Sequence, residues 1–342
     1  MKKKLSVLIA VASFPLILFA QKPLSGADSA RKVIDTIINY ARAKSIYRNH
    51  VNWTALTDSI NKHSAHVQSV QQVMPSVSLI YELLGDYHGF VSYNRKIYKW
   101  RPKKAVVDTV KYKSLLAKMK QKPAVEARML EEGYGYLLIP TNNPTQYGED
   151  DRLAQQIQDS LTTLHPEKLK GLVIDLRTNP GGDMYPMILG VGNLLGNGKL
   201  GSFVDPVSHK QEVWGIKGKA IYTGTDTVCR LNKLGTAATK LKVVVLIGPN
   251  TASSAEATVI SFMGRKNTWF VGEKTGGYTT ANQSFRVWDL NVFMATGVEA
   301  DRNGKVYLDY VLPNQFIIAG DDFNNLNKDA KVIAALAWLH HQ

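Results

Sequence analysis

The segment KVVVLIGPNTASSAEATVISFM, residues 242–263, decides the fold class. It begins with a run of valine, leucine and isoleucine, turns at Gly248-Pro249-Asn250, and continues as an apolar helix pattern from about Ser253. LVIDLRTNPGG, residues 172–182, repeats the order of apolar strand, glycine turn and helix start. Apolar strands that lead directly into helices are typical of parallel sheets covered by helices on both faces. The two segments therefore predict an α/β fold.

Similar patterns extend this unit over residues 126–342, which we expect to form one α/β domain with a parallel-containing sheet covered by helices. Strands are expected at 133–140, 171–177, 242–248 and 267–273, and helices at 150–164, 184–195, 253–264 and 327–341. The stretches 283–296 and 304–313 are also strand-like. Residues 200–240 are rich in glycine, lysine and threonine, and we expect an insertion loop there.

The first 20 residues, MKKKLSVLIAVASFPLILFA, have the pattern of a secretory signal peptide: lysines, an apolar run and a small residue at Ala20. A retained membrane anchor is the alternative, because Leu18 is a poor match to the small residue expected three positions before the cut. Pro15 and an apolar run shorter than the roughly 20 residues of a spanning helix favour cleavage. We expect an exported protein, periplasmic or extracellular, without stable membrane insertion after signal cleavage.

Residues 21–125 are expected to form an N-terminal helical region and a connector. Apolar residues recur at helical spacing in 29–47 and again in 71–86, which indicates a cap of short helices before the α/β domain. Residues 96–123 are basic, and we interpret them as the connector.

Composition limits the possible function classes. The chain has 342 residues, 44% of them hydrophobic, as expected for a globular protein. Cys229 is the single cysteine, so an internal disulfide framework is excluded. Removal of the three signal-peptide lysines lowers the formal net charge from +14 to +11, and the remaining basic residues are scattered. Without a basic stripe or a reader motif, no nucleic-acid partner is expected.

Two motifs lie at the carboxyl ends of predicted strands, where open parallel sheets bind ligands. In the first, Asp175 and Arg177 are followed by Asn179-Pro180-Gly181-Gly182. Glycines at such a turn let backbone N–H groups approach a ligand, as in an oxyanion hole or an anion nest. An ion pair at the strand end followed by a tight turn explains the same residues, and both interpretations stay open.

The second motif places Ser253 and Ser254 at the start of a helix. A serine there is exposed beside unpaired N–H groups and can act as a nucleophile. Helix capping by Thr251, Ser253 or Ser254, with Glu256 completing a capping box, is the more common role of such residues. A nucleophile would also need a base. Among the eight histidines, His88 differs from the rest, because GDYHGF places it between an apolar helix end and an aromatic strand-like run.

Five segments in combination resemble the S41 peptidases, the family of C-terminal processing and tricorn-like serine proteases. In chain order they are LLGDYHGFV, GYGYLLIP, LKGLVIDLRTNPGG, IGPNTASSAEATV and FVGEKTGG. The resemblance runs from about Leu83 to Pro313 and implies a ClpP/crotonase-like core. The family's nucleophile lies three residues before the glutamate, which implies Ser253. The resemblance further implies that the backbone N–H of Ser254 and a glycine N–H from Gly181-Gly182 form the oxyanion hole.

The family divides by its base. Processing proteases use a lysine twenty-five residues after the serine, where this chain has Tyr278, while Lys274 falls four residues earlier. Tricorn-like members use an upstream histidine, which His88 matches in GDYHGF. The resemblance therefore implies that His88 accepts the proton of Ser253.

Two positions depart from the tricorn-like pattern. Tyr87 replaces the serine or similar polar group beside the histidine, and Asp309 is the nearest carboxylate to the family's last glutamate, where it could orient His88 or the water. Glu299 and Asp301 are less favoured substitutes for that role. The roughly forty residues between His88 and Gly133 leave no room for a PDZ module.

The resemblance implies an exported serine peptidase that hydrolyses peptide bonds in extended polypeptides and needs no metal or cofactor. A peptide-binding protein whose catalysis has lapsed is the alternative on the same scaffold. Acyl-thioester chemistry is a third hypothesis, which would use the glycine turn but not the serine.

Overall fold

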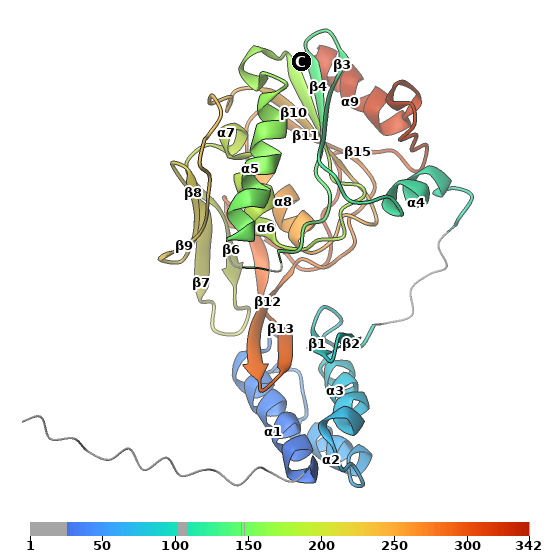
Figure 1. The fold of residues 1–342 in the computed structure, drawn as a ribbon, viewed down its shortest axis with the longest axis vertical. Coiled ribbons are helices and arrows are strands. Elements are labelled where there is room, and N and C mark those ends of the chain that lie inside the picture. The colour runs from blue at the N-terminus through green and yellow to red at the C-terminus, as the bar shows by residue number, and fades with distance from the viewer. Residues whose placement is uncertain (1–25, 102–107, 145, 147, 342) are drawn as a thin grey trace, which may run out of the picture.

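The computed structural model describes residues 26–101, 108–144, 146 and 148–341. The predicted signal peptide lies outside these residues. Two sheets form the framework of the fold, and helices lie between them, outside them and at the N-terminal end (Figure 1).

The first sheet has six strands and confirms the parallel-containing sheet predicted from the sequence. Its strand order is β15 (Gln315–Phe316), β11 (Thr268–Gly272), β10 (Lys242–Ile247), β5 (Gly171–Asp175), β4 (Tyr134–Leu138) and β3 (Glu126–Glu131). All neighbouring pairs are parallel except β3 with β4, which is antiparallel. The central strands β5 and β10 are apolar because both of their faces are buried.

Helices cover both faces of this sheet. Val243 and Val245 of β10 face a core shared with α5 (Glu149–Thr162), α6 (Met184–Leu189), α7 (Gly192–Leu195) and α8 (Ser254–Phe262). Val244 and Leu246, which alternate with them, face the opposite core, shared with α4 (Lys113–Met119), α9 (Ala330–His341) and the 3-10 turn Leu326–Lys328. A second 3-10 turn, Pro166–Lys168, connects α5 to β5. The helix predicted over 184–195 is divided into α6 and α7 at Gly190 and Val191.

The second sheet was not expected, and the prediction of an insertion loop at 200–240 is wrong. That segment contains β6 (Gly198–Val204), β7 (Gln211–Lys217), β8 (Ala220–Thr223) and β9 (Asp226–Arg230), paired in antiparallel order. Burial of Trp214 and Ile216 explains why these strands are stable despite their many glycine and polar residues.

The long strand β13 (Leu290–Asp301) is central to the second sheet. It pairs with β12 (Thr280–Val287) and β14 (Val306–Tyr307) along one edge, and with β1 (Phe90–Tyr93) and β6 along the other. β2 (Lys96–Tyr98) extends β1. The strand-like stretch 283–296 is in fact a hairpin, because the chain turns at Trp288, whose φ is 52°. Within the strand-like stretch 304–313, the residues that form a regular strand are Val306–Tyr307 of β14.

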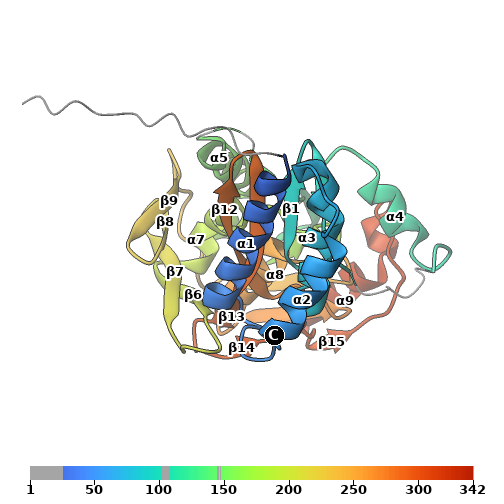
Figure 2. The same ribbon diagram turned by 90° about the horizontal axis from the view of Figure 1, so that it is seen from below.

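The expected N-terminal helices are α1 (Gly26–Lys44), α2 (Trp53–His63) and α3 (Val70–Leu84). Their apolar faces share a core with the far end of the β12–β13 hairpin, so these helices pack against the hairpin and leave its tip exposed (Figures 1 and 2). Within the described residues, no helix is long and apolar enough to cross a membrane.

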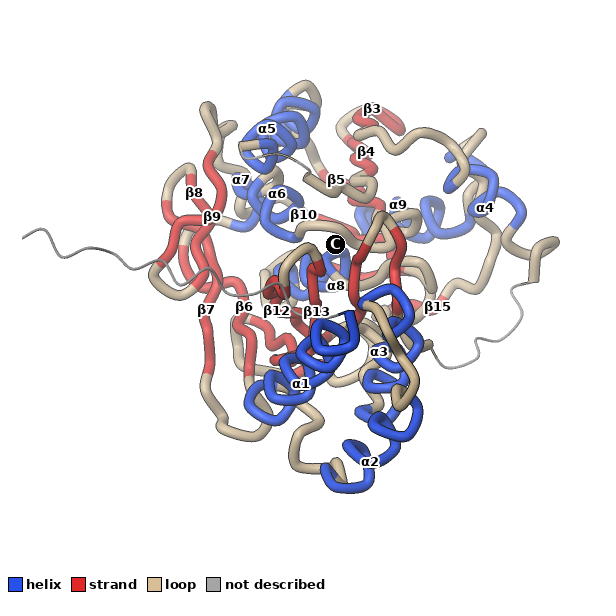
Figure 3. Tube along the Cα trace, turned by 60° about the horizontal axis from the view of Figure 1, so that its bottom comes forward, coloured by secondary structure: helices blue, strands red, loops and turns tan. Residues whose placement is uncertain are grey.

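Helix α8 lies between the two sheets and packs against α6, β6 and β13 (Figure 3). This position brings its N-terminus to the start of β12 and to the loop that joins α3 to β1. The serine, histidine and glycine motifs of the sequence meet there.

Candidate active site

Ser253 is held in a strained conformation at the sharp turn from β10 into α8. Its φ and ψ are 56° and −124°, a combination that side chains other than glycine rarely adopt. It is the N-cap of α8, so its hydroxyl stands at the positive end of the helix dipole, next to the N–H group of Ser254. A serine on a strained strand-to-helix turn is the arrangement that exposes nucleophilic hydroxyls in α/β hydrolases.

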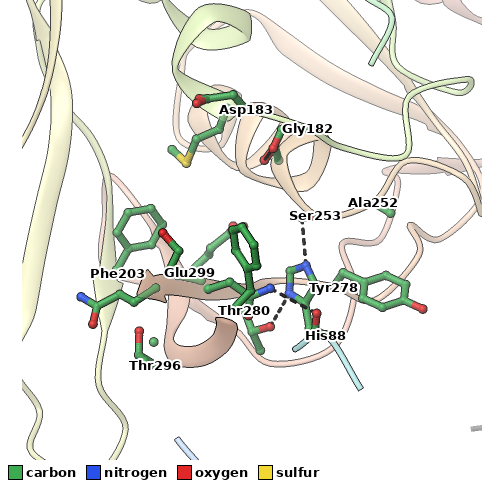
Figure 4. Close-up of a pocket in the computed structure, with 18 of the residues that line it drawn as sticks. His88, Gly182, Asp183, Phe203, Ala252, Ser253, Tyr278, Thr280, Thr296 and Glu299 are labelled. Atoms are coloured by element: carbon green, nitrogen blue, oxygen red, sulfur yellow. Dashed lines mark hydrogen bonds between the residues drawn. The ribbon is translucent and has the colours of Figure 1, made fainter. Parts of the chain in front are cut away.

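His88 contacts Ser253 directly, although 164 residues separate them in the sequence. Its Nε2 lies 2.9 Å from Ser253 Oγ, and its Nδ1 lies 2.7 Å from Thr280 Oγ1 (Figure 4). With the proton on Nδ1 donated to Thr280, the lone pair of Nε2 faces the serine hydroxyl. The ring is therefore oriented to accept a proton from Ser253.

The surroundings of His88 favour the neutral imidazole. Burial of the ring, and to a lesser extent the nearby Arg101 guanidinium, lower the pKa of His88 to about 4. Tyr278 packs edge-on against the ring, with centroids 5.3 Å apart, and Arg101 lies 5.4 Å from the centroid of Tyr278. His88 is thus available as a base at neutral pH.

Asp86 fixes the loop that carries His88. Its buried carboxylate accepts hydrogen bonds from the backbone N–H groups of His88 at 3.1 Å, Gly89 at 2.7 Å and Ala295 at 3.0 Å. The last of these ties the loop to β13. Asp86 is a positioning residue that sequence inspection missed, although its place in GDYHGF was visible.

Glu256 fixes the other half of the site. One carboxylate oxygen accepts from the backbone N–H groups of Ser253 and Tyr278, and the other accepts from Gly277 N–H and the Thr275 hydroxyl. Burial raises the pKa of Glu256 to about 7, and these four donors oppose that shift. The predicted cap is therefore present, and it also ties the serine turn to the segment that leads into Thr280.

The glycine turn lies against the serine turn. Gly181 and Gly182 have φ values of 113° and 126°, and a side chain on Gly182 would lie 1.7 Å from the carbonyl oxygen of Asn142. Gly181 N–H donates to Asn179 Oδ1 at 2.9 Å, so it is already used. The N–H groups of Gly182 and Ser254 donate to no acceptor among the described residues, and the Ser254 hydroxyl donates to Gly182 O at 2.7 Å.

Asp175 and Arg177 are structural. They form a buried ion pair of 2.6 Å, and Arg177 also pairs with Asp321 and Asp329 near the start of α9. Of the two interpretations left open by the sequence, the ion pair therefore holds for these residues. Asn179, in contrast, shapes the glycine turn.

The structure does not place Asp309 at His88. Its side chain is exposed beyond β14, and Thr280 occupies the ring nitrogen that Asp309 was expected to face. Tyr87 donates its hydroxyl to Gly277 O at 2.8 Å. Lys274 is exposed, with its ammonium 4.7 Å from the centroid of the Tyr310 ring. Thr280 was missed in the sequence, because a threonine is not the usual partner of a basic histidine.

A cleft of about 1450 Å³ contains the serine and histidine side chains. Its walls come from the glycine turn, the start of α8, strands β12 and β13, and the β6–β7 loop. Within the described residues, no group of three or more histidine, cysteine, aspartate and glutamate side chains is arranged to hold a metal ion. The arrangement can carry out nucleophilic attack on a carbonyl with proton transfer to a neutral histidine.

Known proteins are similar to this chain over most of its length. The chain is 26% identical over 315 residues to the nisin-resistance protein of Lactococcus lactis subsp. lactis, covering 92% of this chain and 88% of that protein. A lipoprotein from Streptococcus agalactiae has the same fold, with a TM-score of 0.68 at 22% identity over 93% of this chain and 97% of that one. The photosystem II D1 C-terminal processing protease matches with a TM-score of 0.54 at 15% identity over 86% and 93%.

The profile of peptidase family S41 matches residues 133–304, half of the chain. The matched residues include the serine turn and the glycine turn but begin after His88, so the family match does not bear on the histidine. The chain belongs to peptidase family S41.

Proposed function

We propose that the mature protein is an exported serine peptidase that hydrolyses peptide bonds in extended polypeptides, with Ser253 as the nucleophile and His88 as the general base. One observation carries the assignment: the 2.9 Å contact between His88 Nε2 and Ser253 Oγ at the N-terminus of α8. Membership of family S41 supports the reaction class.

The proposed reaction follows from this geometry. Ser253 Oγ attacks the substrate carbonyl carbon while its proton passes to His88 Nε2, and Thr280 holds the resulting imidazolium through Nδ1–H. The N–H groups of Ser254 and Gly182 would donate to the oxyanion. His88 then protonates the leaving amine, which leaves an acyl group on Ser253. Water attacks the acyl carbon and passes a proton to His88, and His88 returns that proton to Ser253 Oγ as the acid is released.

The cleft suits an extended chain. Within the described residues β12 pairs with β13 alone, and residues 280–284 of β12 line the cleft. A substrate strand could pair with this edge and pass the carbonyl to Ser253. Export is consistent with the sequence pattern of residues 1–20 and with similarity to a lipoprotein from Streptococcus agalactiae.

Hydrolysis of an unfolded polypeptide tests the proposal. Reduced and carboxymethylated lysozyme should be cut by the wild type, with cleavage lost in Ser253→Ala and nearly unchanged in Lys274→Ala, because Lys274 does not line the cleft. Nisin belongs in the same assay, because the similar Lactococcus lactis protein is named for resistance to it.

A lapsed peptide-binding protein is the second candidate, favoured by one observation: within the described residues, no carboxylate forms a hydrogen bond with the imidazole ring of His88. Tight binding of these polypeptides without any cleavage would support it and contradict the peptidase. Loss of cleavage in Lys274→Ala would instead assign the chain to the serine–lysine branch.

A further inference from the structure

We propose that Glu299 is a specificity-determining residue, which binds a lysine or arginine side chain of the polypeptide in the cleft beside Ser253. This inference rests on the proposed peptidase function and goes beyond it by naming the chemistry of one substrate residue. It starts from a carboxyl group that neither the fold nor the proposed reaction uses.

The carboxyl group of Glu299 is buried, and its Oε2 is unpaired within the part of the chain that the structure describes. The residue is 3% exposed, and its Oε2 has no hydrogen-bond partner in the structure. Within the described residues, no lysine, arginine or histidine forms an ion pair with it. Buried polar groups are almost always paired, so an unpaired carboxyl group in a cleft indicates a partner supplied by a ligand.

Glu299 is connected to the reacting groups by a shared cleft and by a backbone hydrogen bond. It lies on β13 and lines the same cleft as Ser253 and His88 (Figure 4). Its backbone N–H donates to Thr279 O at 2.9 Å, one residue before the threonine that holds His88. A side chain that reaches Glu299 would therefore belong to a substrate residue close to the bond being cut.

The wall beside this carboxyl suits a long side chain with a charged end. Phe203 on β6 is the cross-strand partner of Glu299, so the two side chains share one face of the sheet. Gly297, two residues earlier on β13, adds no side chain there and also lines the cleft. The methylene groups of lysine or arginine would pack along the Phe203 ring, with the cation at the carboxyl.

A cation fits the local charges better than a neutral amide. Burial, and then the nearby Glu256, raise the pKa of Glu299 well above its usual range, which favours the uncharged carboxyl group when the cleft is empty. An arriving cation favours the ionised carboxylate, and the proton leaves to solvent. The basic residues Lys44, Lys99 and Lys210 also line the cleft, but they are exposed, so solvent and salt screen them.

Binding by a catalytically inactive protein tests recognition separately from turnover. The full chain with Ser253→Ala is titrated with fluorescent peptides of one sequence in which a single position, moved along the peptide, carries lysine, norleucine or glutamine. At one position the lysine peptide should bind about tenfold more tightly than the other two, as expected for one charged hydrogen-bonded pair. Adding Glu299→Gln should reduce the preference to less than about twofold.

Matched variants separate recognition from folding and from net charge. Asp289→Asn removes a negative charge at the exposed hairpin tip and should leave the preference unchanged. Glu299→Asp keeps a carboxylate and should retain part of the preference for lysine. This variant keeps the proposal testable if Glu299→Gln fails to fold. The proposal is overturned if no position prefers lysine, if glutamine binds as well as lysine, or if Glu299→Gln keeps the full preference.

The same peptides distinguish this proposal from the proposed function. Preference for lysine by the inactive protein, without cleavage of any peptide by the wild type, would leave Glu299 as a recognition residue and contradict the peptidase. Cleavage without preference at any position would support the peptidase and overturn the role of Glu299.

Discussion

Replacing Thr280 by valine tests how His88 is held for proton transfer. Valine keeps the shape of the buried side chain but removes the oxygen that lies 2.7 Å from His88 Nδ1. A buried donor left without a partner costs about 1–3 kcal/mol. If the ring is then free to turn away from Ser253, this cost falls on the transition state, and kcat/KM should decrease by about 5- to 150-fold.

The assay is the rate of inactivation by a fluorophosphonate probe, measured beside kcat/KM for an identified peptide. The probe reports the reactivity of the serine and makes few substrate contacts, so both rates should fall together. Thr279→Val is the matched control, because Thr279 is also buried but donates its hydroxyl to Tyr307 O at 2.9 Å. A Thr280→Val protein that reacts within about twofold of the wild type, with Thr279→Val equally active, would refute this account of how His88 is oriented.

Three further predictions concern the same elements. Because burial and Arg101 lower the pKa of His88 to about 4, the rate of probe inactivation should stay level on acidification and fall only near pH 4; a midpoint near the usual histidine value would contradict this. Asp86→Asn should lower the free energy of unfolding in urea by about 1–3 kcal/mol, because one of its three backbone donors would face an amide N–H; unchanged stability would show that these hydrogen bonds do not hold the loop. Gly182→Ala should reduce kcat by about 100-fold or more, because the new Cβ would clash with Asn142 O and displace an oxyanion donor; near-normal kcat would exclude Gly182 from that role.

The α/β character was predictable because buried parallel strands are apolar on both faces and lead directly into helices. Residues 171–177 and 242–248 have that pattern, and both strands lie at the centre of the first sheet. The segment 200–240 was not predictable, since its short antiparallel strands bury few side chains, such as Trp214, among many polar ones. The turn at Trp288 was missed because tryptophan rarely adopts a positive φ.

The residues of the candidate site also differ in how far the sequence could predict them. Local sequence made Ser253 a helix cap, and the wider pattern paired it with His88. The structure places Ser253 at the N-cap of α8 with its Oγ 2.9 Å from His88 Nε2, so one residue can serve in both ways. Thr280 could not be predicted, and the sequence offered Glu299 only as a substitute for Asp309, because the function of both residues depends on what lies opposite them in space. A threonine at a strand start and a glutamate within a strand have ordinary structural roles in most sequences.

Locating a covalent adduct tests the central claim most directly. The mature protein is treated with a fluorophosphonate probe, digested, and the modified residue is identified by mass spectrometry, in parallel with Ser253→Ala, Ser254→Ala and His88→Ala. The account predicts an adduct on Ser253 that persists in Ser254→Ala and forms far more slowly in His88→Ala. An adduct on any other residue, or labelling of Ser253 at an unchanged rate without His88, would contradict it.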